Sequence, residues 1–291
     1  MFSLMTKKTR SFCSSEYDKL IRVVLCPPRY MTIKDLINET QKHFKDEGIN
    51  IEKAMEQHDQ MVKTLRSHGV DVILLPEQER YPEQVFTRDI GFTLGQTIFV
   101  AEMASDVRQG EEDVFKGWLE QEKISYYNLV GDRIEGGDVI IDRNKIFVGL
   151  SDRTNKYAID HLRTLLPDYE VIVIPFTEKY LHLDCVFNII SPHEAIYFPG
   201  AFTKKERNIL EYHYDLIEVS EEEQFTLGTN VLSIGEKRIL SLPVNKKVNA
   251  QLRQRGFEVI EVDITEIIKS GGSFRCCTLP IYREESEYAA N

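Results

Sequence analysis

Short apolar runs alternate with longer amphipathic segments along this chain. Residues 21–26 and 70–75 are compact apolar runs of the kind that form buried strands. Between them, residues 51–67 place apolar side chains three and four positions apart, which predicts a helix that ends before Gly69. The chain therefore opens with the order strand, helix, strand.

The rest of the chain repeats a longer unit, in which a hairpin of two strands is followed by a helix and a third strand. The hairpin turns lie near Gly95, Asn144, His193 and Gly235, so they are 49, 49 and 42 residues apart. This spacing is typical of structural repeats, although the units share no evident sequence identity. The predicted hairpins occupy residues 85–103, 138–150, 185–198 and 230–242; the helices 106–123, 155–166, 204–214 and 245–255; and the third strands 126–130, 169–174, 216–219 and 257–262.

The fifth unit is divided between the two ends of the chain. A strand at 278–282 supplies its first part, and the opening strand, helix and strand supply the rest. Five such units joined head to tail predict a closed α/β ring, because pairing of the end strands leaves no incomplete unit. Since no linker rich in Pro, Gly or Ser interrupts the pattern, we expect a single domain over residues 1–291, with a flexible segment at 1–15.

Composition and charge narrow the class of partner. With 42% hydrophobic and 29% charged residues, the chain has the composition of an ordinary globular protein. Its net charge of −11 argues against a nucleic-acid partner and favours a small cationic one. The sequence shows neither a signal peptide nor an apolar stretch of membrane-spanning length, which predicts a cytoplasmic protein without a membrane partner. We interpret the acidic run 221–223 as a solvated loop, and the oligomeric state stays open, with a homodimer as one option.

The five cysteines do not form a recognisable framework. They are odd in number and lack the C-x-x-C spacing of metal sites, so we expect no disulfide framework, no metal and no cofactor. Cys26 and Cys185 are interpreted as core residues. The pair Cys276-Cys277, taken alone, is also more typical of small buried side chains than of a reactive site.

Chemically reactive side chains nevertheless lie at the starts of the predicted hairpins. In a ring of related units these equivalent positions approach one axis, so a thiol, an imidazole and several carboxylates should meet there. A nucleophile with a general acid/base is then available, and two carboxylates on opposite sides fit a planar guanidinium. The hairpin starts read Phe86-Thr87-Arg88-Asp89, Glu135-Gly136-Gly137-Asp138, His182-Leu183-Asp184, Thr229-Asn230 and Arg275-Cys276-Cys277.

Five motifs, in this order, resemble the guanidine-modifying, or pentein, superfamily of arginine deiminases, dimethylarginine dimethylaminohydrolases and amidinotransferases. The resemblance covers nearly the whole chain and implies a five-bladed α/β propeller, which agrees with the ring predicted from the repeats. The motifs are FTRD (86–89), EGGDV (135–139), FVGLSDRTN (147–155), HLDCVF (182–187) and GGSFRCCTLP (271–280).

The resemblance also implies a role for individual residues. Cys276 is similar to the family nucleophile, His182 to its general acid/base and Glu135 to the carboxylate partner of that histidine. The residues implied in substrate binding are Asp89 and Asp184 for the guanidinium, Arg153 for an α-carboxylate, and Phe86 and Arg88 of the FTRD motif; Asp138 is implied as a supporting, structural carboxylate.

Alternatives stand beside several of these roles. Arg153 can instead cap its helix or form a salt bridge. Cys277 becomes the nucleophile if the motif is misaligned by one residue, but strand alternation should turn it away from Cys276. A surface position is the default expectation for the remaining histidines, which are His43, His58, His68, His161, His193 and His213.

The implied function is a cysteine-dependent hydrolase of arginine or an N-omega-substituted arginine. It would form a covalent thiouronium intermediate and release a ureido product with ammonia or an amine. FTRD and HLD resemble deiminases and amidinotransferases, whereas GLSDRTN resembles dimethylaminohydrolases. An amidinotransferase is therefore the first alternative. Two non-enzymatic alternatives are an inactive ring that binds an arginine-like ligand and the related fold of translation initiation factor 6.

Overall fold

The repeated pattern folds into five three-stranded sheets, one for each predicted unit. The computed structural model describes residues 11–34 and 36–285. In every sheet two strands pair antiparallel, and the middle strand also pairs parallel with a third. The sheets are β15 (Leu279–Glu284), β1 (Lys19–Leu25) and β2 (Asp71–Leu74); β3 (Gly91–Leu94), β4 (Thr97–Val100) and β5 (Tyr126–Asn128); β6 (Val139–Asp142), β7 (Lys145–Leu150) and β8 (Glu170–Pro175); β9 (Phe187–Ile189), β10 (Glu194–Tyr197) and β11 (Asp215–Glu218); and β12 (Leu232–Gly235), β13 (Arg238–Ser241) and β14 (Glu258–Glu261).

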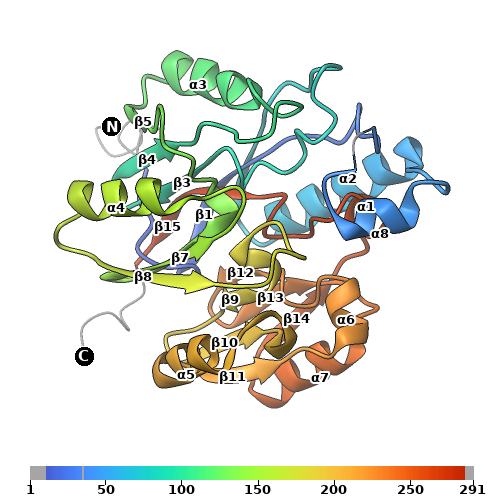
Figure 1. Ribbon diagram of the computed structural model, residues 1–291. Helices are drawn as coiled ribbons and strands as arrows, with labels where there is room; N and C mark the ends of the chain where they lie inside the picture. The colour runs from blue at the N-terminus through green and yellow to red at the C-terminus, as the bar shows by residue number, and fades with distance from the viewer. Residues whose placement is uncertain (1–10, 35, 286–291) are drawn as a thin grey trace, which may run out of the picture.

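Pairing between the two ends of the chain closes the ring, as predicted. Strand β1 pairs antiparallel with β15, with Val24 opposite Leu279, and parallel with β2, with Val23 opposite Val72. Neighbouring sheets then meet where β15 lies against β3, β6 against β9 and β1 against β12. The five-bladed α/β propeller is confirmed (Figure 1).

The segment before β1 differs from expectation. Residues 1–10 of the predicted flexible segment lie outside the described residues, but residues 11–15 are tied to the ring. Cys13 and Gly95 exchange two backbone hydrogen bonds of 3.0 and 2.8 Å, and Ser15 forms a bridge with Asp142. Because these backbone groups are paired within the ring, residues 11–15 belong to the ordered structure.

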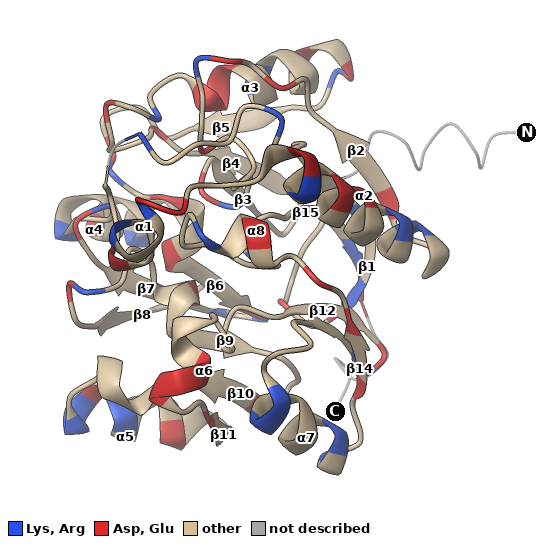
Figure 2. Cartoon of the chain, turned by 90° about the vertical axis from the view of Figure 1, so that its right-hand side faces the viewer, with Lys and Arg blue, Asp and Glu red and all other residues tan. Residues whose placement is uncertain are grey.

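The longer helices lie around the outside of the ring (Figure 1). Helix α2 has the predicted bounds, Ile51–Ser67, and buries Ala54, Met61 and Leu65 on one face. Charged residues of both signs lie along the outer helices (Figure 2), as the amphipathic pattern requires. Within the described part of the chain, no helix is both long and apolar enough to cross a bilayer. The other long helices are α3 (Glu111–Gln121), α4 (Lys156–Leu165), α5 (Lys204–His213) and α7 (Lys246–Gln254).

Three short helices were not predicted from the pattern: α1 (Glu39–Phe44), α6 (Glu221–Phe225) and α8 (Thr265–Ile268). Helix α6 corrects the interpretation of 221–223 as a solvated loop. Ser220 caps this helix by accepting a hydrogen bond from Glu223 N. The buried Glu223 carboxylate in turn accepts hydrogen bonds from Lys247 N and Val248 N at the start of α7. Through Glu223, the acidic run therefore links α6 to the start of α7.

One of the six histidines expected at the surface is buried. His58 lies on the inward face of α2, in the same three-and-four spacing as Ala54 and Met61, and is only 3% exposed. Its position on the helix, rather than its polarity, decides its burial. Burial lowers the pKa of His58 to about 4.

Candidate active site

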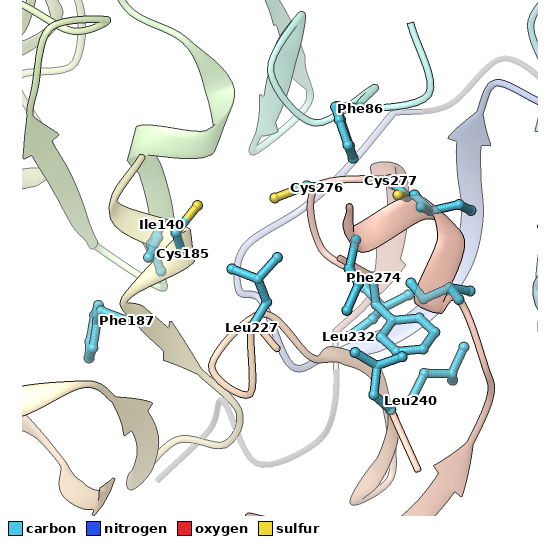
Figure 3. Packing of buried hydrophobic residues seen from close by; sticks show 14 of the residues in the cluster. Phe86, Ile140, Cys185, Phe187, Leu227, Leu232, Leu240, Phe274, Cys276 and Cys277 are labelled. Carbon is cyan, nitrogen blue, oxygen red and sulfur yellow. The ribbon is translucent and has the colours of Figure 1, made fainter. Parts of the chain in front are cut away.

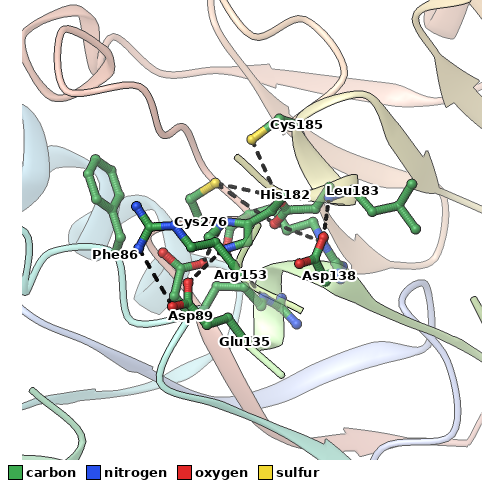
Figure 4. A network of polar contacts seen from close by, with 12 residues as sticks. Phe86, Asp89, Glu135, Asp138, Arg153, His182, Leu183, Cys185 and Cys276 are labelled. Carbon is green, nitrogen blue, oxygen red and sulfur yellow. Dashed lines mark hydrogen bonds and ion pairs between the residues drawn. The ribbon is translucent and has the colours of Figure 1, made fainter. Parts of the chain in front are cut away.

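Three of the hairpin starts line one small cavity, through Phe86 and Asp89, His182, and Cys276. The start at 135–138 joins the polar network beside this cavity (Figure 4). Short 3-10 turns, η1 (Gly136–Asp138) and η2 (Leu183–Cys185), lead into β6 and β9 and lie against each other. They follow directly after Glu135 and His182, which are buried together with Asp89, Asp184 and Cys276. The structure thus brings together five of the residues predicted from sequence. The cavity is lined by Ile37, Glu83, Phe86, Asp89, Arg108, Leu181, His182, Cys185, Ser270, Gly271, Gly272 and Cys276.

His182 lies between two carboxylates. Its Nε2 is 2.7 Å from Glu135 Oε2, and its Nδ1 is 3.4 Å from Asp89 Oδ1. Burial opposes a charge on the ring, but Asp89, Glu135 and Asp138 outweigh it and raise the pKa of His182 to about 10. Burial alone would raise the pKa of the Glu135 carboxyl. The hydrogen bond and the charge of His182 outweigh burial and lower this pKa below its usual 4.5. An imidazolium that can donate a proton is therefore favoured.

Cys276 lies in a turn that precedes β15, not in the strand itself. Its N–H donates to Asn230 Oδ1 at 3.1 Å, and its carbonyl accepts from Arg88 N at 3.0 Å. The two thiols leave different sides of this turn, and only Cys276 lines the cavity (Figure 3). Cys277 does point away, as predicted, but turn geometry rather than strand alternation is the reason.

Asp184 faces the thiol of Cys276. Its two carboxylate oxygens lie 3.7 and 3.8 Å from Cys276 Sγ, and Oδ2 lies 3.3 Å from Arg275 Nε. Burial raises the pKa of Asp184, while the positive charges of Arg275 and His182 oppose that rise. Asn230 Nδ2 donates to the backbone carbonyl of Asp184 at 3.0 Å. Asn230 therefore holds both Cys276 and Asp184 in place.

Two glycines allow the backbone to approach these side chains. A Cβ atom at Gly137 would lie 2.7 Å from both Asp89 Oδ1 and His182 Cγ. At Gly272, a Cβ atom would lie 2.3 Å from the Phe86 ring. Both positions exclude any larger residue without movement of the site. This close approach explains the glycines in EGGDV and GGSFRCCTLP.

Asp138 supports the turn that carries His182. Its Oδ1 accepts from Leu183 N at 2.8 Å and its Oδ2 accepts from Ser151 Oγ at 2.6 Å. Burial raises the pKa of this carboxyl to about 6. Asp138 does not line the cavity, which is the supporting position that the resemblance implied.

The two other predicted arginines lie behind the cavity lining. Arg153 Nη1 is 3.7 Å from Glu135 Oε1, so the salt bridge considered as its alternative role is present. Arg88 turns toward the centre of the ring, where Nη1 is 3.7 Å from Glu16 Oε2 and Nε donates to the carbonyl of Arg275 at 3.4 Å. Of the FTRD motif, Phe86 and Asp89 face the cavity and Arg88 does not.

Sequence reasoning missed Arg108, which lines the cavity and is 2% exposed. Its Nη1 donates to Asp89 Oδ2 at 2.6 Å, and its Nη2 donates to Glu111 Oε2 at 2.8 Å. Arg108 lies in a turn before α3 and belongs to no periodic pattern. Nothing in the sequence marks it as the partner of Asp89.

Residues 37–41 are hydrogen-bonded to two residues that line the cavity, Glu83 and Ser270. Asn38 Nδ2 donates to the carbonyl of Ser270 at 2.8 Å, and Gln41 Nε2 donates to Glu83 Oε1 at 2.8 Å. Burial raises the pKa of Glu83 to about 7. Neither Gln41 nor Glu83 was a candidate from sequence, because no motif included them.

Among the described residues, one group of side chains could together hold a metal ion. It consists of Asp184, Cys185 and Cys276, whose ligand atoms lie within 4.8 Å of one another. Cys185 is therefore more than the core residue expected from sequence, since it also lines the cavity.

Comparisons with known proteins identify relatives of this chain. A family model described as "N,N dimethylarginine dimethylhydrolase, eukaryotic" matches residues 27–283. An uncharacterized protein of Bacillus subtilis (strain 168), YkgA, is 53% identical over 97% of this chain and 99% of its own length. The N(G),N(G)-dimethylarginine dimethylaminohydrolase of Mycobacterium tuberculosis is 26% identical over 90% of this chain and 86% of its own.

A solved structure extends the likeness to three dimensions. The N-terminal domain of ArgZ, a cyanobacterial arginine dihydrolase crystallised with its product, superimposes with a TM-score of 0.83 at 27% identity. The match covers 91% of this chain and 98% of that domain. The chain therefore belongs to the dimethylarginine dimethylaminohydrolase family, within the guanidine-modifying, or pentein, superfamily.

Proposed function

We propose that this protein hydrolyses the guanidino group of arginine or of an N-omega-substituted arginine, using Cys276 as the nucleophile. One observation carries the proposal. The Cys276 thiol, the buried His182 imidazole with its raised pKa and the Asp89 carboxylate line one cavity, and the Asp184 carboxylate lies 3.7 Å from the thiol. Relatives of this chain are named dimethylarginine dimethylaminohydrolase and arginine dihydrolase, and both names refer to arginine or a derivative of it.

Charge complementarity supports a guanidinium ligand. Arg108 pairs with Asp89 Oδ2, whereas Asp89 Oδ1 accepts no hydrogen bond in the described part of the chain and has only its 3.4 Å ion pair with His182 Nδ1. A substrate N–H group can donate to this oxygen, and another can donate to Asp184. Because Asp184 lies within 3.8 Å of Cys276 Sγ, the guanidinium carbon then lies against the thiol.

The proposed reaction has two halves. The Cys276 thiolate attacks the guanidinium carbon, and protonated His182 donates its proton to the departing nitrogen. This leaves a thiouronium on Cys276 and a neutral His182. Water then gives one proton to His182, and its oxygen attacks the same carbon. The C–S bond breaks, and the second water proton leaves with Cys276 as its thiol as the ureido product is released. Asp89, Glu135 and Asp138 favour the protonated form of His182 that the first half requires.

The proposed ligand for the substrate α-carboxylate is Arg153, as the resemblance implies, with Arg108 as a second candidate because it lines the cavity. These two can be separated with agmatine, which has a guanidino group but no carboxylate. Replacement of the true ligand by methionine should raise the KM for arginine and leave that for agmatine nearly unchanged.

The decisive experiment incubates the protein with arginine, its N-omega-methyl and asymmetric dimethyl derivatives, and an acceptor amine. A ureido product together with ammonia, methylamine or dimethylamine supports the proposal and identifies the substrate. Transfer of the amidino group to the acceptor would replace it with a transferase, and absence of both products would support a binding role. Cys276→Ala should abolish turnover, with Cys277→Ala as the matched control that retains it.

Substrate preference can be tested at Asp184. A dimethylated nitrogen has no N–H left to donate, so it gains little from a second carboxylate. Asp184→Asn should therefore weaken turnover of arginine more than that of the asymmetric dimethyl derivative. Equal losses for both substrates would contradict the role given to this carboxylate.

A further inference from the structure

A second thiol lies beside the proposed nucleophile. The Sγ atoms of Cys185 and Cys276 lie within 4.8 Å of each other and point toward one another (Figure 3). Asp184 Oδ1 lies between them, 3.6 Å from Cys185 Sγ and 3.7 Å from Cys276 Sγ. The hydrolytic mechanism gives Cys185 no role, so its position calls for a separate explanation.

The local structure allows these two sulfur atoms to approach further. A disulfide requires about 2 Å between them. Cys185 ends the short turn η2, and Cys276 lies in the turn 274–277, so neither residue is held within a paired strand. A disulfide therefore requires a change of side-chain rotamer and a small adjustment of the two turns.

Cys185 is also placed where a small oxidant would arrive. Two neighbouring cavities share Leu181, Cys185 and Gly271 in their linings, and only the inner one contains Cys276. Cys185 therefore lies at the junction of the two. The other described cysteines, Cys13, Cys26 and Cys277, are buried and line neither cavity.

Asp184 is placed to carry a proton between the two thiols. Its Oδ1 lies 3.6 Å from Cys185 Sγ, so it can accept the proton that Cys185 loses. The same oxygen lies 3.7 Å from Cys276 Sγ, so that proton can pass to a group that leaves Cys276.

We propose that Cys185 is a resolving thiol, which converts a peroxide-oxidised Cys276 into an intramolecular disulfide. First, the Cys276 thiolate attacks one oxygen of hydrogen peroxide, the O–O bond breaks, and Cys276 becomes a sulfenic acid as hydroxide leaves. Cys185 sulfur then attacks Cys276 sulfur and the S–O bond breaks. The thiol proton leaves with the hydroxyl group as water, with Asp184 as its carrier. Overall two thiols lose two electrons, and the peroxide is reduced to water.

Such a disulfide would block the nucleophile reversibly. It would also keep Cys276 from the irreversible sulfinic and sulfonic acids, because the sulfenic acid is consumed before a second peroxide reacts. A dithiol reductant restores both thiols. The effect on turnover rests on the function proposed above, whereas the disulfide itself does not.

Mass spectrometry tests the bond directly. The Cys277→Ala variant is best used as background, because its tryptic peptide 276–283 then contains a single cysteine, whereas peptide 180–204 contains only Cys185. After limited hydrogen peroxide and alkylation of free thiols, we expect these two peptides to be cross-linked, and dithiothreitol to separate them. The same protein carrying Cys185→Ala should give no cross-link and should accumulate Cys276 sulfinic acid faster.

Turnover gives the second measurement. Peroxide should inactivate the parent protein, and dithiothreitol should restore its activity, whereas Cys185→Ala and Cys185→Ser should be inactivated without recovery. Thermal unfolding of both variants checks that they fold. The same rate of Cys276 over-oxidation with and without Cys185, and no cross-link, would overturn the proposal. A cross-link in a protein that converts no guanidine would instead retain the disulfide and reject the hydrolase.

Discussion

Replacing Glu135 with glutamine tests the buried histidine–carboxylate pair at the centre of the site. Glu135 accepts hydrogen bonds from two directions, at 2.7 Å with His182 Nε2 and at 2.9 Å from Ala104 N. Glutamine keeps the shape of the side chain but has one acceptor oxygen and one NH2 group. If its oxygen faces Ala104, its NH2 group faces His182, which can then pair only as a neutral ring with an unprotonated Nε2.

The pKa of His182 sets the magnitude. A rise from the ordinary 6.5 to about 10 corresponds to about 5 kcal/mol of stabilisation, at about 1.4 kcal/mol per pH unit. Because Asp89 supplies part of this and the pair is fully buried, we expect Glu135→Gln to lower the free energy of unfolding by about 3 kcal/mol at pH 6. Loss of the protonated acid should also lower kcat by about 10²–10⁴-fold.

The pH dependence has a definite sign. The pKa of His182 is raised on folding, so its stabilisation is complete below pH 6.5 and is lost as the pH rises to about 10. The pKa of Glu135 is lowered on folding, so its stabilisation is complete above its ordinary 4.5 and is lost in acid. The difference between parent and variant should therefore be largest between about pH 5 and 6.5 and should shrink toward pH 10.

Guanidinium chloride unfolding at a series of pH values, together with turnover, measures both effects. Asp132→Asn is the matched control, because Asp132 also pairs with a histidine, His161, whose side chain is 39% exposed. That variant should lose less stability than Glu135→Gln, because His161 remains in contact with water, and it should keep its activity. The reasoning is refuted if Glu135→Gln is no less stable than Asp132→Asn, or if its deficit does not shrink as the pH rises.

Two further predictions concern buried titratable residues outside the cavity. His58, whose pKa is lowered to about 4, should destabilise the fold by up to about 3 kcal/mol as the pH falls from 6.5 to 4, and His58→Leu should remove this acid sensitivity in unfolding measurements; an unchanged pH profile would contradict this. Glu16→Gln should cost about 3–5 kcal/mol and raise KM, because Glu16 balances Arg275 and Arg88, and Arg275 contacts Asp184. Unchanged thermal unfolding and KM would show that these arginines need no such partner.

The ring could be predicted because burial imposes a period on every unit. Helix α2 matches its predicted bounds, since its apolar face packs along its whole length against the interior. Short elements such as α6 and α8 are one turn long, too short for a period of 3.6 residues to show. Their positions depend on capping and tertiary contacts, which a pattern of apolar residues does not encode.

The residues of the site likewise fall into those that the sequence predicts and those that only the folded structure reveals. Residues at hairpin starts could be found because the repeat fixes where they converge, and the motif resemblance then assigned their roles. Arg108 could not be found, since its contact with Asp89 depends on how the turn before α3 folds back. The sequence places Cys185 in the core, because an apolar thiol is typical of a buried position. That its thiol lies close to Cys276 can be seen only in the folded structure.

Ring closure and the position of the nucleophile depend on the same contacts. Cys276 lies three residues before β15, whose pairing with β1 closes the ring. The preceding residue, Arg275, is held by Glu16 in the segment leading into β1, and its Nε lies 3.3 Å from Asp184. Contacts with the N-terminal part of the chain therefore fix the residues both before and after Cys276, through Arg275 and through β15. Strands β1 and β15 lie at opposite ends of the chain and are held together by their strand pairing. Loss of this pairing would displace Cys276 from His182, while the other four sheets keep their own strand pairs.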